Sequence, residues 1–480
     1  GNPASTFGHA LLKLNTDSTD DESGLFDLVL NYGAVVPENE ATSTYVLRGL
    51  FGGYEAGFSD KYFYTQDLVY TRTEFRDIWD YKLNLSDDQR ILLVFHIWEI
   101  IGKKFTYYFL DKNCAYRLAE LIELATDEEL LDHAHLWYIP VEMFHRLKAV
   151  DKVRRESGDA GLIQSVRFIP SSQRVLYHQL GQLLPQEIKA ANTIIKEGHA
   201  AMPGHVKAFM PDRQIEILDA LLAYHQYQLV AEEPTPDIGR RKAKDQILLE
   251  RLRLPARIEP RPEVPELNSP AQGSRPMAIG IGVARDWDGE SYWRAQWAPF
   301  SQELVGLNSL EGSELAVLDL IVGLKDEGNA FIDQLDFVRV RKLNTAPVAV
   351  VGERQWAWQL RATTRRTGHD EEGSRDTFIR FGAGISREWK KMFVIYAMTD
   401  VAGHRLSPHA RLRPHIGISA RMGALGAWGY VGAETTNSGA EFRDVWGGKL
   451  QYHLSSQQAF RVQVSNENNA RTSISFISYW

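Results

Sequence analysis

The sequence predicts an α+β protein whose second half is an all-β antiparallel barrel. The chain has 480 residues, which is more than one ordinary hydrophobic core accommodates. Apolar residues recur at helical spacing up to about residue 254 and at a spacing of two after residue 277. A segment with six prolines separates these patterns. We therefore expect a mixed α+β domain (1–150), a helical extension (151–254), a proline-rich linker (255–276) and a barrel (277–480).

The composition narrows the class of protein. Hydrophobic residues make up 44% of the chain and charged residues 24%, as in folded proteins. The net charge of -8 argues against a nucleic-acid partner, because contact with phosphates needs a basic surface. The single cysteine, Cys114, excludes an intramolecular disulfide and zinc sites with several cysteines. There is no apolar run of eighteen residues that predicts a transmembrane helix. The chain starts inside a strand-like pattern with no leader, so we expect upstream residues to be missing.

The N-terminal segment predicts a β-hairpin. Residues 9–15 and 25–31 have the character of strands, and the acidic, polar loop 16–24 joins them. An antiparallel hairpin centred on residue 20 places His9 opposite Asn31.

A glycine- and aromatic-rich stretch, GLFGGYEAGF, follows the hairpin. Its glycines lack the Gly-Lys-Ser/Thr ending of a phosphate loop, which argues against nucleotide binding. We expect them to form tight turns beside a substrate groove, which Tyr54 and Phe58 line.

Two helices are predicted in the rest of the first domain. Ser86 and Gln89 have the spacing of a capping box, so one helix starts at Ser86. Apolar residues keep helical spacing along it: Leu92, Phe95, Trp98 and Ile101. The second helix follows the sequence LDKN and carries Leu118, Leu121, Ile122 and Ala125 on one face. The basic run at 240–244, in the helical extension, is interpreted as a solvated helix face, with contact to a membrane surface as the alternative.

About twelve segments after residue 277 alternate apolar with polar or small residues. Each is 8–12 residues long, and turn residues separate them, a spacing typical of an antiparallel barrel. Nine of the twelve tryptophans lie there, as expected for the aromatic girdles of an outer-membrane barrel. The alternative is a soluble barrel or sandwich with a tryptophan-rich core, and the sequence FIDQLDFVRVRK favours it because charges fall on both faces of that strand.

Cys114 is the candidate nucleophile. If Asp111 or Asn113 caps the second helix, Cys114 falls in its first turn, where free N–H groups and the helix dipole favour a thiolate. The same N–H groups can hold an oxyanion, and a histidine is the natural base. The alternative is a buried, inert cysteine. Spacing alone cannot select the base among fourteen histidines.

Five motifs carry a family resemblance. They are NPASTFGHALLKL, LNYGA, GLFGGYEAGF, EFRDIWDYKLNLS and FTYYFLDKNCAYRLAELIE, in that order over roughly residues 1–150. Together they resemble the Lnb N-terminal periplasmic domain family. The most specific are the Phe-Gly-His before a strand and the Asn-Cys at a helix start. The resemblance implies a circularly permuted, NlpC-like papain fold in which Cys114 is the nucleophile and His9 the general base.

The remaining site residues are less firmly assigned. A papain-type site orients its imidazole with a polar side chain from a neighbouring strand. The hairpin register selects Asn31 for this role, and Tyr32 is the fallback because a slip of one residue turns Asn31 away. Asn113 either caps the helix or helps to hold the oxyanion.

Other polar clusters receive structural interpretations or remain open. Glu74, Arg76 and Asp77 form either a buried ion network near the site or a surface cluster. His133 and His135 have poor spacing for a metal on a helix, and no third ligand is evident, so no metal is expected. For His96 and Glu99, three residues apart, a structural hydrogen bond is expected.

The resemblance implies a thiol acyltransferase of the bacterial cell envelope, in the periplasm or outer membrane and without a cofactor. The substrates are a lipoprotein and an acyl lipid, and the acyl chain passes through a thioester on Cys114. One alternative is an envelope cysteine hydrolase or amidase with the same pair. Another is a non-catalytic outer-membrane binding or structural protein.

Overall fold

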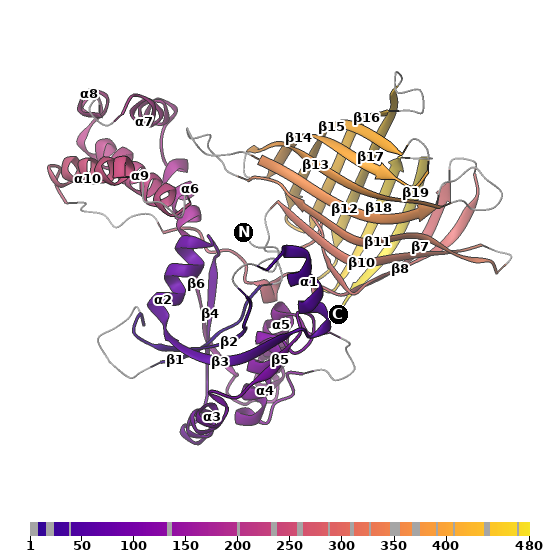
Figure 1. Ribbon diagram of the computed structural model, residues 1–480, viewed down its shortest axis with the longest axis horizontal. Coiled ribbons are helices and arrows are strands. Elements are labelled where there is room, and N and C mark those ends of the chain that lie inside the picture. Colours follow the sequence, from indigo (N-terminus) through magenta and orange to yellow (C-terminus); the bar gives the residue numbers. More distant parts are fainter. Residues whose placement is uncertain are drawn as a thin grey trace. The chain divides into compact units, whose positions relative to one another are not determined.

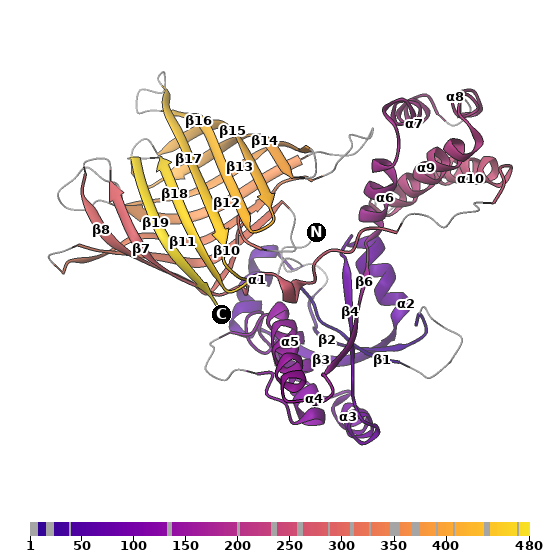
Figure 2. The ribbon, with the colours of Figure 1, turned by 180° about the vertical axis from the view of Figure 1, so that it is seen from behind.

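Figures 1 and 2 show the computed structural model of the chain. It describes residues 8–15, 24–37, 40–131, 137–198, 202–231, 238–256, 263–286, 289–307, 312–325, 328–345, 356–366, 375–389, 392–406, 409–435, 442–467 and 470–480. The chain divides into two compact units, Gly1–Ala271 and Gln272–Trp480. Within the described ranges, no helix is both long and apolar enough to cross a membrane.

The first unit is an α/β region built on a four-stranded antiparallel sheet of order β1-β2-β3-β5. Its strands are Leu12–Leu14 (β1), Leu28–Ala34 (β2), Tyr54–Tyr62 (β3) and Phe105–Tyr107 (β5). A separate antiparallel pair joins β4 (Ile78–Leu83) to β6 (Ile163–Ile169). The helices are α1 (Thr42–Phe51), α2 (Phe63–Asp67), the π-helix η2 (Leu68–Thr73), α3 (Asp87–Ile100), α4 (Cys114–Thr126), α5 (Pro140–Glu156), α6 (Ser172–Gly181), α7 (Pro185–Glu197), α8 (Met202–Val206), α9 (Pro211–Ala231) and α10 (Ile238–Leu252).

The predicted register of the first hairpin is wrong by two residues. Leu12 lies opposite Leu30, whereas a hairpin centred on residue 20 places it opposite Leu28. A shift of two residues keeps every side chain on its predicted face, because the side-chain period of a strand is two. The connecting residues 16–23 lie outside the described residues.

Helix α3 starts as predicted but buries a different face. The Ser86 hydroxyl accepts a hydrogen bond from the Gln89 N–H, and the Gln89 side chain accepts one from the Ser86 N–H, which completes the capping box. Leu93 and Ile97 are the side chains that enter the core. The four apolar residues whose spacing predicts the helix are all exposed: Leu92, Phe95, Trp98 and Ile101.

Helix α4 forms the centre of the core of the first unit. Its predicted apolar face is buried with neighbours from the sheet, α3 and α5 (Leu118, Leu121, Ile122, Ala125). Burial of these side chains fixes the helix, and therefore its N-terminus, against strand β2. The helix begins at Cys114, so the core positions the cysteine.

The second unit is a closed barrel of twelve antiparallel strands within the described residues, as predicted. The sheet runs β11 to β19 in chain order, continues through β7, β8 and β10, and closes where β10 pairs with β11. The short strand β9 (Phe300–Gln302) pairs with β10 beside β8. The twelve strands are Ala278–Asp286 (β7), Ser291–Ala298 (β8), Ser313–Leu324 (β10), Ala330–Lys342 (β11), Trp356–Arg366 (β12), Arg375–Trp389 (β13), Phe393–His404 (β14), Ala410–Met422 (β15), Leu425–Thr435 (β16), Phe442–His453 (β17), Gln458–Asn466 (β18) and Ala470–Tyr479 (β19).

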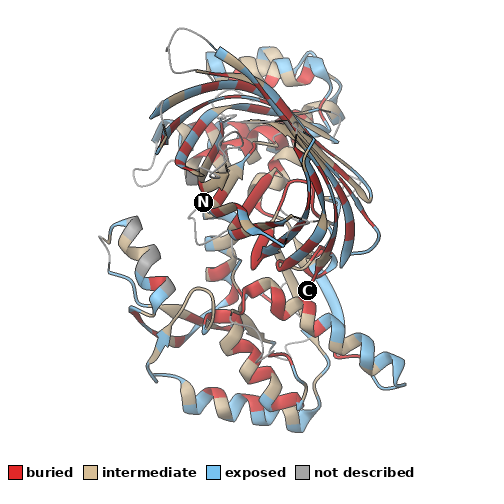
Figure 3. Ribbon diagram, turned by 90° about the vertical axis from the view of Figure 1, so that its right-hand side faces the viewer, coloured by how far each residue is buried: buried red, intermediate tan, exposed pale blue. Residues whose placement is uncertain are grey.

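The barrel is polar inside and apolar outside. In β8, the exposed side chains include Trp293 and Trp297, whereas Arg294 and Gln296 are buried in the interior. Buried and exposed residues alternate in this way along the strands, as the bands of Figure 3 show. A surface of alternating large apolar side chains around a charged interior is the pattern of a barrel that spans a lipid bilayer. The soluble alternative, with tryptophans in the core, is therefore rejected.

Two β-bulges explain the strand with charges at irregular spacing. In β11 the register shifts at Asp333 against β10 and at Phe337 against β12. Each bulge adds one residue and reverses which positions face inward. Asp333, Asp336 and Arg339 consequently all lie in the interior, while Phe337 is exposed.

Candidate active site

Cys114 occupies the first position of α4 and is 1% exposed. Asn113 is the N-cap residue: its side-chain oxygen accepts hydrogen bonds from the N–H groups of Ala115 and Tyr116, both at 3.1 Å. Its amide nitrogen donates to the carbonyl oxygens of Phe109 and Tyr138. The Asn113 side chain is thus fully occupied as a cap, and it leaves the sulfur at the positive end of the helix dipole.

His9 lies between the sulfur and Asn31. Its Nε2 atom is 2.8 Å from Oδ1 of Asn31 on β2, and the imidazole also makes a hydrogen bond to the Cys114 side chain. An amide oxygen only accepts hydrogen bonds, so Nε2 carries a proton and Nδ1 is the nitrogen that can take the proton of the thiol. His9 and Cys114 are separated by 105 positions in the sequence. Together with Asn31 they nevertheless form one continuous series of hydrogen bonds.

The two reactive side chains change each other's pKa. Burial raises the pKa of the Cys114 thiol, but the charge and hydrogen bond of His9 and the backbone N–H groups of Ala10 and Ala115 outweigh it, so that pKa is lowered. Burial lowers the pKa of His9, but the Cys114 thiolate and the hydrogen bond to Asn31 outweigh it, so that pKa is raised. Each group therefore favours the charged form of the other, thiolate beside imidazolium, and the thiolate is the form that attacks an acyl group.

Tyr107 is a member of the site that sequence reasoning missed. It lies on β5, and its hydroxyl accepts a hydrogen bond from the backbone N–H of Cys114. That N–H is one of the groups expected to hold an oxyanion. Burial and the nearby Cys114 raise the pKa of Tyr107, so its hydroxyl keeps its proton and can itself donate. The pair of tyrosines in FTYYF, seven residues before the cysteine, is the only signal in the sequence.

Tyr32, the fallback for the third residue, is not placed beside His9. Its ring is buried in the core, stacked on Tyr107 with 5.8 Å between ring centroids. The Arg117 guanidinium lies near its hydroxyl, and burial raises the pKa of Tyr32. Tyr32 therefore packs against Tyr107, and of the two candidates Asn31 is the side chain that is hydrogen-bonded to His9.

Tyr54 and Phe58 are both buried on β3 and have different neighbours. Phe58 packs on Tyr32 with 4.9 Å between ring centroids and belongs to the apolar core. The Tyr54 hydroxyl donates to Glu40. Two of the nearby glycines are required by packing, because a side chain at Gly49 would meet the ring of Phe109 and one at Gly52 would meet the ring of Tyr108.

Helix η2 contributes a second aromatic residue, Tyr70. Its ring centroid is 5.7 Å from that of His9, and the guanidinium of Arg76 lies 5.5 Å from it. Arg76 is ion-paired with Glu74, and its positive charge lowers the pKa of His9. Asp77 has a different role: it accepts hydrogen bonds at 2.9 Å from the Ser171 N–H and from Arg174, which ties the start of α6 to the first domain. The predicted network therefore divides between the site and the helical extension.

The histidines outside the pair form no metal site among the described residues, where no group of three or more His, Cys, Asp or Glu side chains could hold an ion. His133 and His135 lie outside the described residues. His96 is 3.3 Å from Glu99 on α3, in the expected structural contact.

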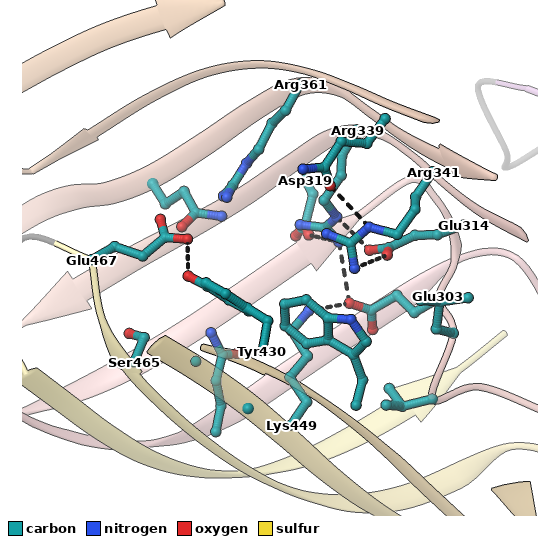
Figure 4. Close-up of a pocket in the computed structure, with 18 of the residues that line it drawn as sticks. Glu303, Glu314, Asp319, Arg339, Arg341, Arg361, Tyr430, Lys449, Ser465 and Glu467 are labelled. Atoms are coloured by element: carbon teal, nitrogen blue, oxygen red, sulfur yellow. Dashed lines mark hydrogen bonds and ion pairs between the residues drawn. The ribbon is translucent and has the colours of Figure 1, made fainter. Parts of the chain in front are cut away.

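The interior of the barrel holds a dense ion-pair network around a cavity of about 100 Å³ (Figure 4). Arg339 binds four carboxylates, those of Glu303, Glu314, Asp319 and Asp336. A second cluster surrounds Glu467, which accepts from Arg365, Arg413 and Tyr430. Charges buried away from water require partners of this kind, so the network stabilises the polar interior.

These features define an envelope protein with two parts, a membrane barrel and an α/β unit with a thiol–imidazole pair. Residues 1–149 match the family model of the Lnb N-terminal periplasmic domain. Residues 267–479 match a family described as a domain of unknown function, DUF7840. The match at the N-terminus confirms the resemblance derived from the motifs, and the chain is assigned to the cell envelope.

Solved structures similar to this chain are barrels. They include the KdgM porin in complex with disordered oligogalacturonate, at 10% identity and a TM-score of 0.28, covering 42% of this chain and 99% of that one. The COG4313 outer membrane channel from Pseudomonas putida F1 has 7% identity and a TM-score of 0.25, covering 45% and 100%. A triple mutant of the Rhodopseudomonas blastica porin has 8% identity and a TM-score of 0.21, covering 42% and 98%. No protein of curated function matches the chain.

Proposed function

We propose that the first unit is a thiol acyltransferase that moves a fatty acyl chain through a thioester on Cys114. The single observation that carries this proposal is the hydrogen-bonded series Asn31–His9–Cys114 at the N-terminus of α4. A permuted papain-like, NlpC-like domain accounts for the order of these parts, since the histidine precedes the strands and the cysteine helix follows them. The match supports a periplasmic domain, and the resemblance of the motifs to the Lnb family implies an acyl lipid and a lipoprotein as substrates.

In the first step, the Cys114 thiolate attacks the carbonyl carbon of a glyceryl or phospholipid ester. The resulting oxyanion accepts hydrogen bonds from the backbone N–H of Cys114 and from the Tyr107 hydroxyl. Before the attack this hydroxyl accepts a hydrogen bond from the Cys114 N–H, and afterwards it donates its own proton to the oxyanion. When the intermediate collapses, the C–O bond breaks and the imidazolium of His9 gives its proton to the leaving alkoxide. The products of this step are a free alcohol and an acyl-Cys114 thioester.

In the second step, the amine of a lipoprotein's N-terminal cysteine attacks the thioester. Neutral His9 takes a proton from the amine, the C–S bond breaks, and the thiolate returns with an imidazolium beside it. Asn31 keeps Nε2 protonated throughout, so the same nitrogen of His9 exchanges the proton in both steps. The net reaction converts an ester into an amide and needs no cofactor.

Two other functions use the same residues differently. In an envelope hydrolase or amidase, water replaces the amine in the second step. In a non-catalytic outer-membrane protein, the thiol–imidazole pair has no substrate. The raised His9 pKa and lowered Cys114 pKa favour an enzyme, because a buried inert thiol is expected to have a raised pKa.

The decisive experiment measures the intact mass of the full chain after incubation with a diacylated lipopeptide and phospholipid, together with the peptide products. Acyl transfer predicts a fatty-acyl adduct on Cys114 and an N-acylated peptide. Cys114→Ser and His9→Ala are expected to give neither. An adduct with release of free fatty acid only would establish the hydrolase instead. If no adduct forms and both variants match the unmodified protein, catalysis by this pair is excluded.

A further inference from the structure

Helix α3 carries exposed apolar side chains over a wide part of its surface, with the carboxylates of Asp87, Asp88 and Glu99 among them, and buries residues on one side only. Leu93 and Ile97 occupy a narrow buried stripe against the core. Six large apolar side chains lie outside this stripe and are exposed: Ile91, Leu92, Val94, Phe95, Trp98 and Ile101. At about 100° per residue, these six cover roughly half of the helix surface. We call them the α3 apolar face.

The α3 apolar face differs from ordinary scattered surface residues. Trp98 is 82% exposed and Phe95 is 67% exposed, and the two are three residues apart on one side of the helix. Six large apolar side chains exposed on one helix form a contiguous face of the kind that marks a contact with a partner or a lipid surface. The helix is the lowest one in Figure 1, and in Figure 3 exposed and buried residues both occur along its ribbon.

We propose that the α3 apolar face inserts into the phospholipid leaflet of the membrane that holds the barrel. The barrel presents an apolar exterior, and one chain carries both the barrel and α3, so this helix is tethered to the membrane that holds the barrel. An exposed tryptophan beside aliphatic residues is the composition that anchors helices at a lipid–water interface. Lys103 lies three residues after the end of the helix and is exposed, where its ammonium group can reach phosphates, whereas Lys104 is ion-paired with Glu55.

This inference does not rest on the thiol chemistry, since neither Cys114 nor His9 lies on the face. If acyl transfer is correct, docking of α3 holds the site next to its lipid donor. If acyl transfer is wrong, the lipid contact still stands or falls by a direct measurement.

The test uses the full chain in proteoliposomes with an environment-sensitive fluorophore on one introduced cysteine. Cys114→Ser removes the only native thiol, and Phe95→Cys or Trp98→Cys provides the label on the face. The matched control is Val153→Cys on α5, an exposed apolar position outside the face. Lipids with nitroxide groups in their acyl chains are expected to quench the labels at 95 and 98 strongly and the label at 153 little.

Three outcomes overturn the proposal. A water-like emission at 95 and 98 means that the face stays in solvent. A blue-shifted emission without nitroxide quenching means that protein covers it, either another part of this chain or a second copy. Equal quenching at 95, 98 and 153 means that the proximity is unspecific. Each labelled variant must show the heat-modifiable migration of a folded barrel and the same resistance of the first unit to proteolysis as the Cys114→Ser protein, so that loss of folding in either unit cannot imitate a result.

Discussion

The two units of this protein bury opposite kinds of side chain. In the first unit the core around α4 is apolar and the exterior is mainly polar. In the barrel, Arg380 is 1% exposed while Ile416 is 60% exposed. The same rule produces both patterns: each side chain faces the medium that solvates it best, which is water over most of the first unit and lipid around the barrel. The comparison shows that the exposed fraction of a side chain does not tell whether it faces water or lipid. The composition of the whole exposed face does tell this.

The two units also differ in how they use buried charge. The barrel distributes its charges over a network, in which Arg339 alone binds four carboxylates. The first unit concentrates reactive charge in the single pair of Cys114 and His9. We expect the network to act on stability and the pair to act on reactivity. The predictions below separate these two effects.

The largest expected effect is on the proposed reaction. Cys114→Ser should lower the rate of acyl transfer by at least about a thousandfold, because the hydroxyl is a far weaker nucleophile beside His9. The initial rate of N-acylated peptide formation measures it, with the free energy of unfolding as the control. A variant that retains substantial activity would contradict the role of Cys114.

The barrel network should respond through stability instead. Arg339→Leu leaves four buried carboxylates without their shared partner, which is expected to cost about 3–5 kcal/mol of the barrel's free energy of unfolding. Urea unfolding in lipid vesicles, followed by heat-modifiable migration, measures the loss. Arg339→Lys keeps the charge and should lose less. Unchanged stability in Arg339→Leu would mean that the network is not a structural element.

The third prediction compares two apolar side chains that are equally exposed, one on the barrel and one on the first unit. Ile416 and Val153 are 60% and 61% exposed, one on β15 and one on α5. Ile416→Arg should destabilise the barrel by about 2–4 kcal/mol, because a guanidinium near the bilayer midplane is costly. Val153→Arg should change stability by no more than about 0.5 kcal/mol, as for an ordinary surface position. Equal effects at both positions would reject the lipid-facing assignment.

Much of this architecture is predictable because local signals determine it. The capping box at Ser86, the cysteine at the start of a helix and the period of two in the barrel depend on neighbours within a few residues. The register of the first hairpin is not local, since the loop 16–24 lacks a defined turn signal, and the prediction was wrong by two residues. The buried face of α3 was predicted wrongly for another reason. Apolar residues occur on every side of this helix, so their spacing does not indicate which side faces the core.

The tyrosines of the site escaped prediction because tertiary structure alone brings them near Cys114. Tyr107 arrives on β5 and Tyr70 on a π-helix, and neither has a motif that marks it. Asn31 was predictable because it shares a hairpin with His9, and the error of two residues kept it on the correct face. The bulges of β11 were hidden in the same way, since a bulge has no fixed residue type at its centre.

The fourth prediction concerns the pH dependence of the thiol. The lowered pKa of Cys114 means that its thiolate persists below the usual range of cysteine and is lost only as the pH falls through that lowered value. The raised pKa of His9 keeps the imidazolium until the pH rises through that raised value. His9→Ala should slow alkylation of Cys114 by iodoacetamide at least about tenfold at pH 7, because an isolated thiol has a pKa near 8.5. A pH profile that does not shift in His9→Ala would show that the pair is not coupled.

The smallest expected effect lies at the cap that both positions the thiol and stabilises α4. Asn113→Ala removes the acceptor for the Ala115 and Tyr116 N–H groups, which should cost about 1 kcal/mol of the stability of the first unit. Asn113→Asp keeps the acceptor for these two N–H groups but loses the amide that donates to the carbonyls of Phe109 and Tyr138, so it should recover only the part of the stability that comes from the cap. The same substitution places a negative charge beside Cys114 and should raise its pKa, so alkylation at neutral pH should slow although the helix is capped. Unfolding and alkylation measured together therefore distinguish the effect of the cap from the effect of charge. If Asn113→Asp restores both stability and the alkylation rate, the cap alone determines the reactivity of the thiol. If it restores stability but not the alkylation rate, the absence of charge on Asn113 contributes to that reactivity.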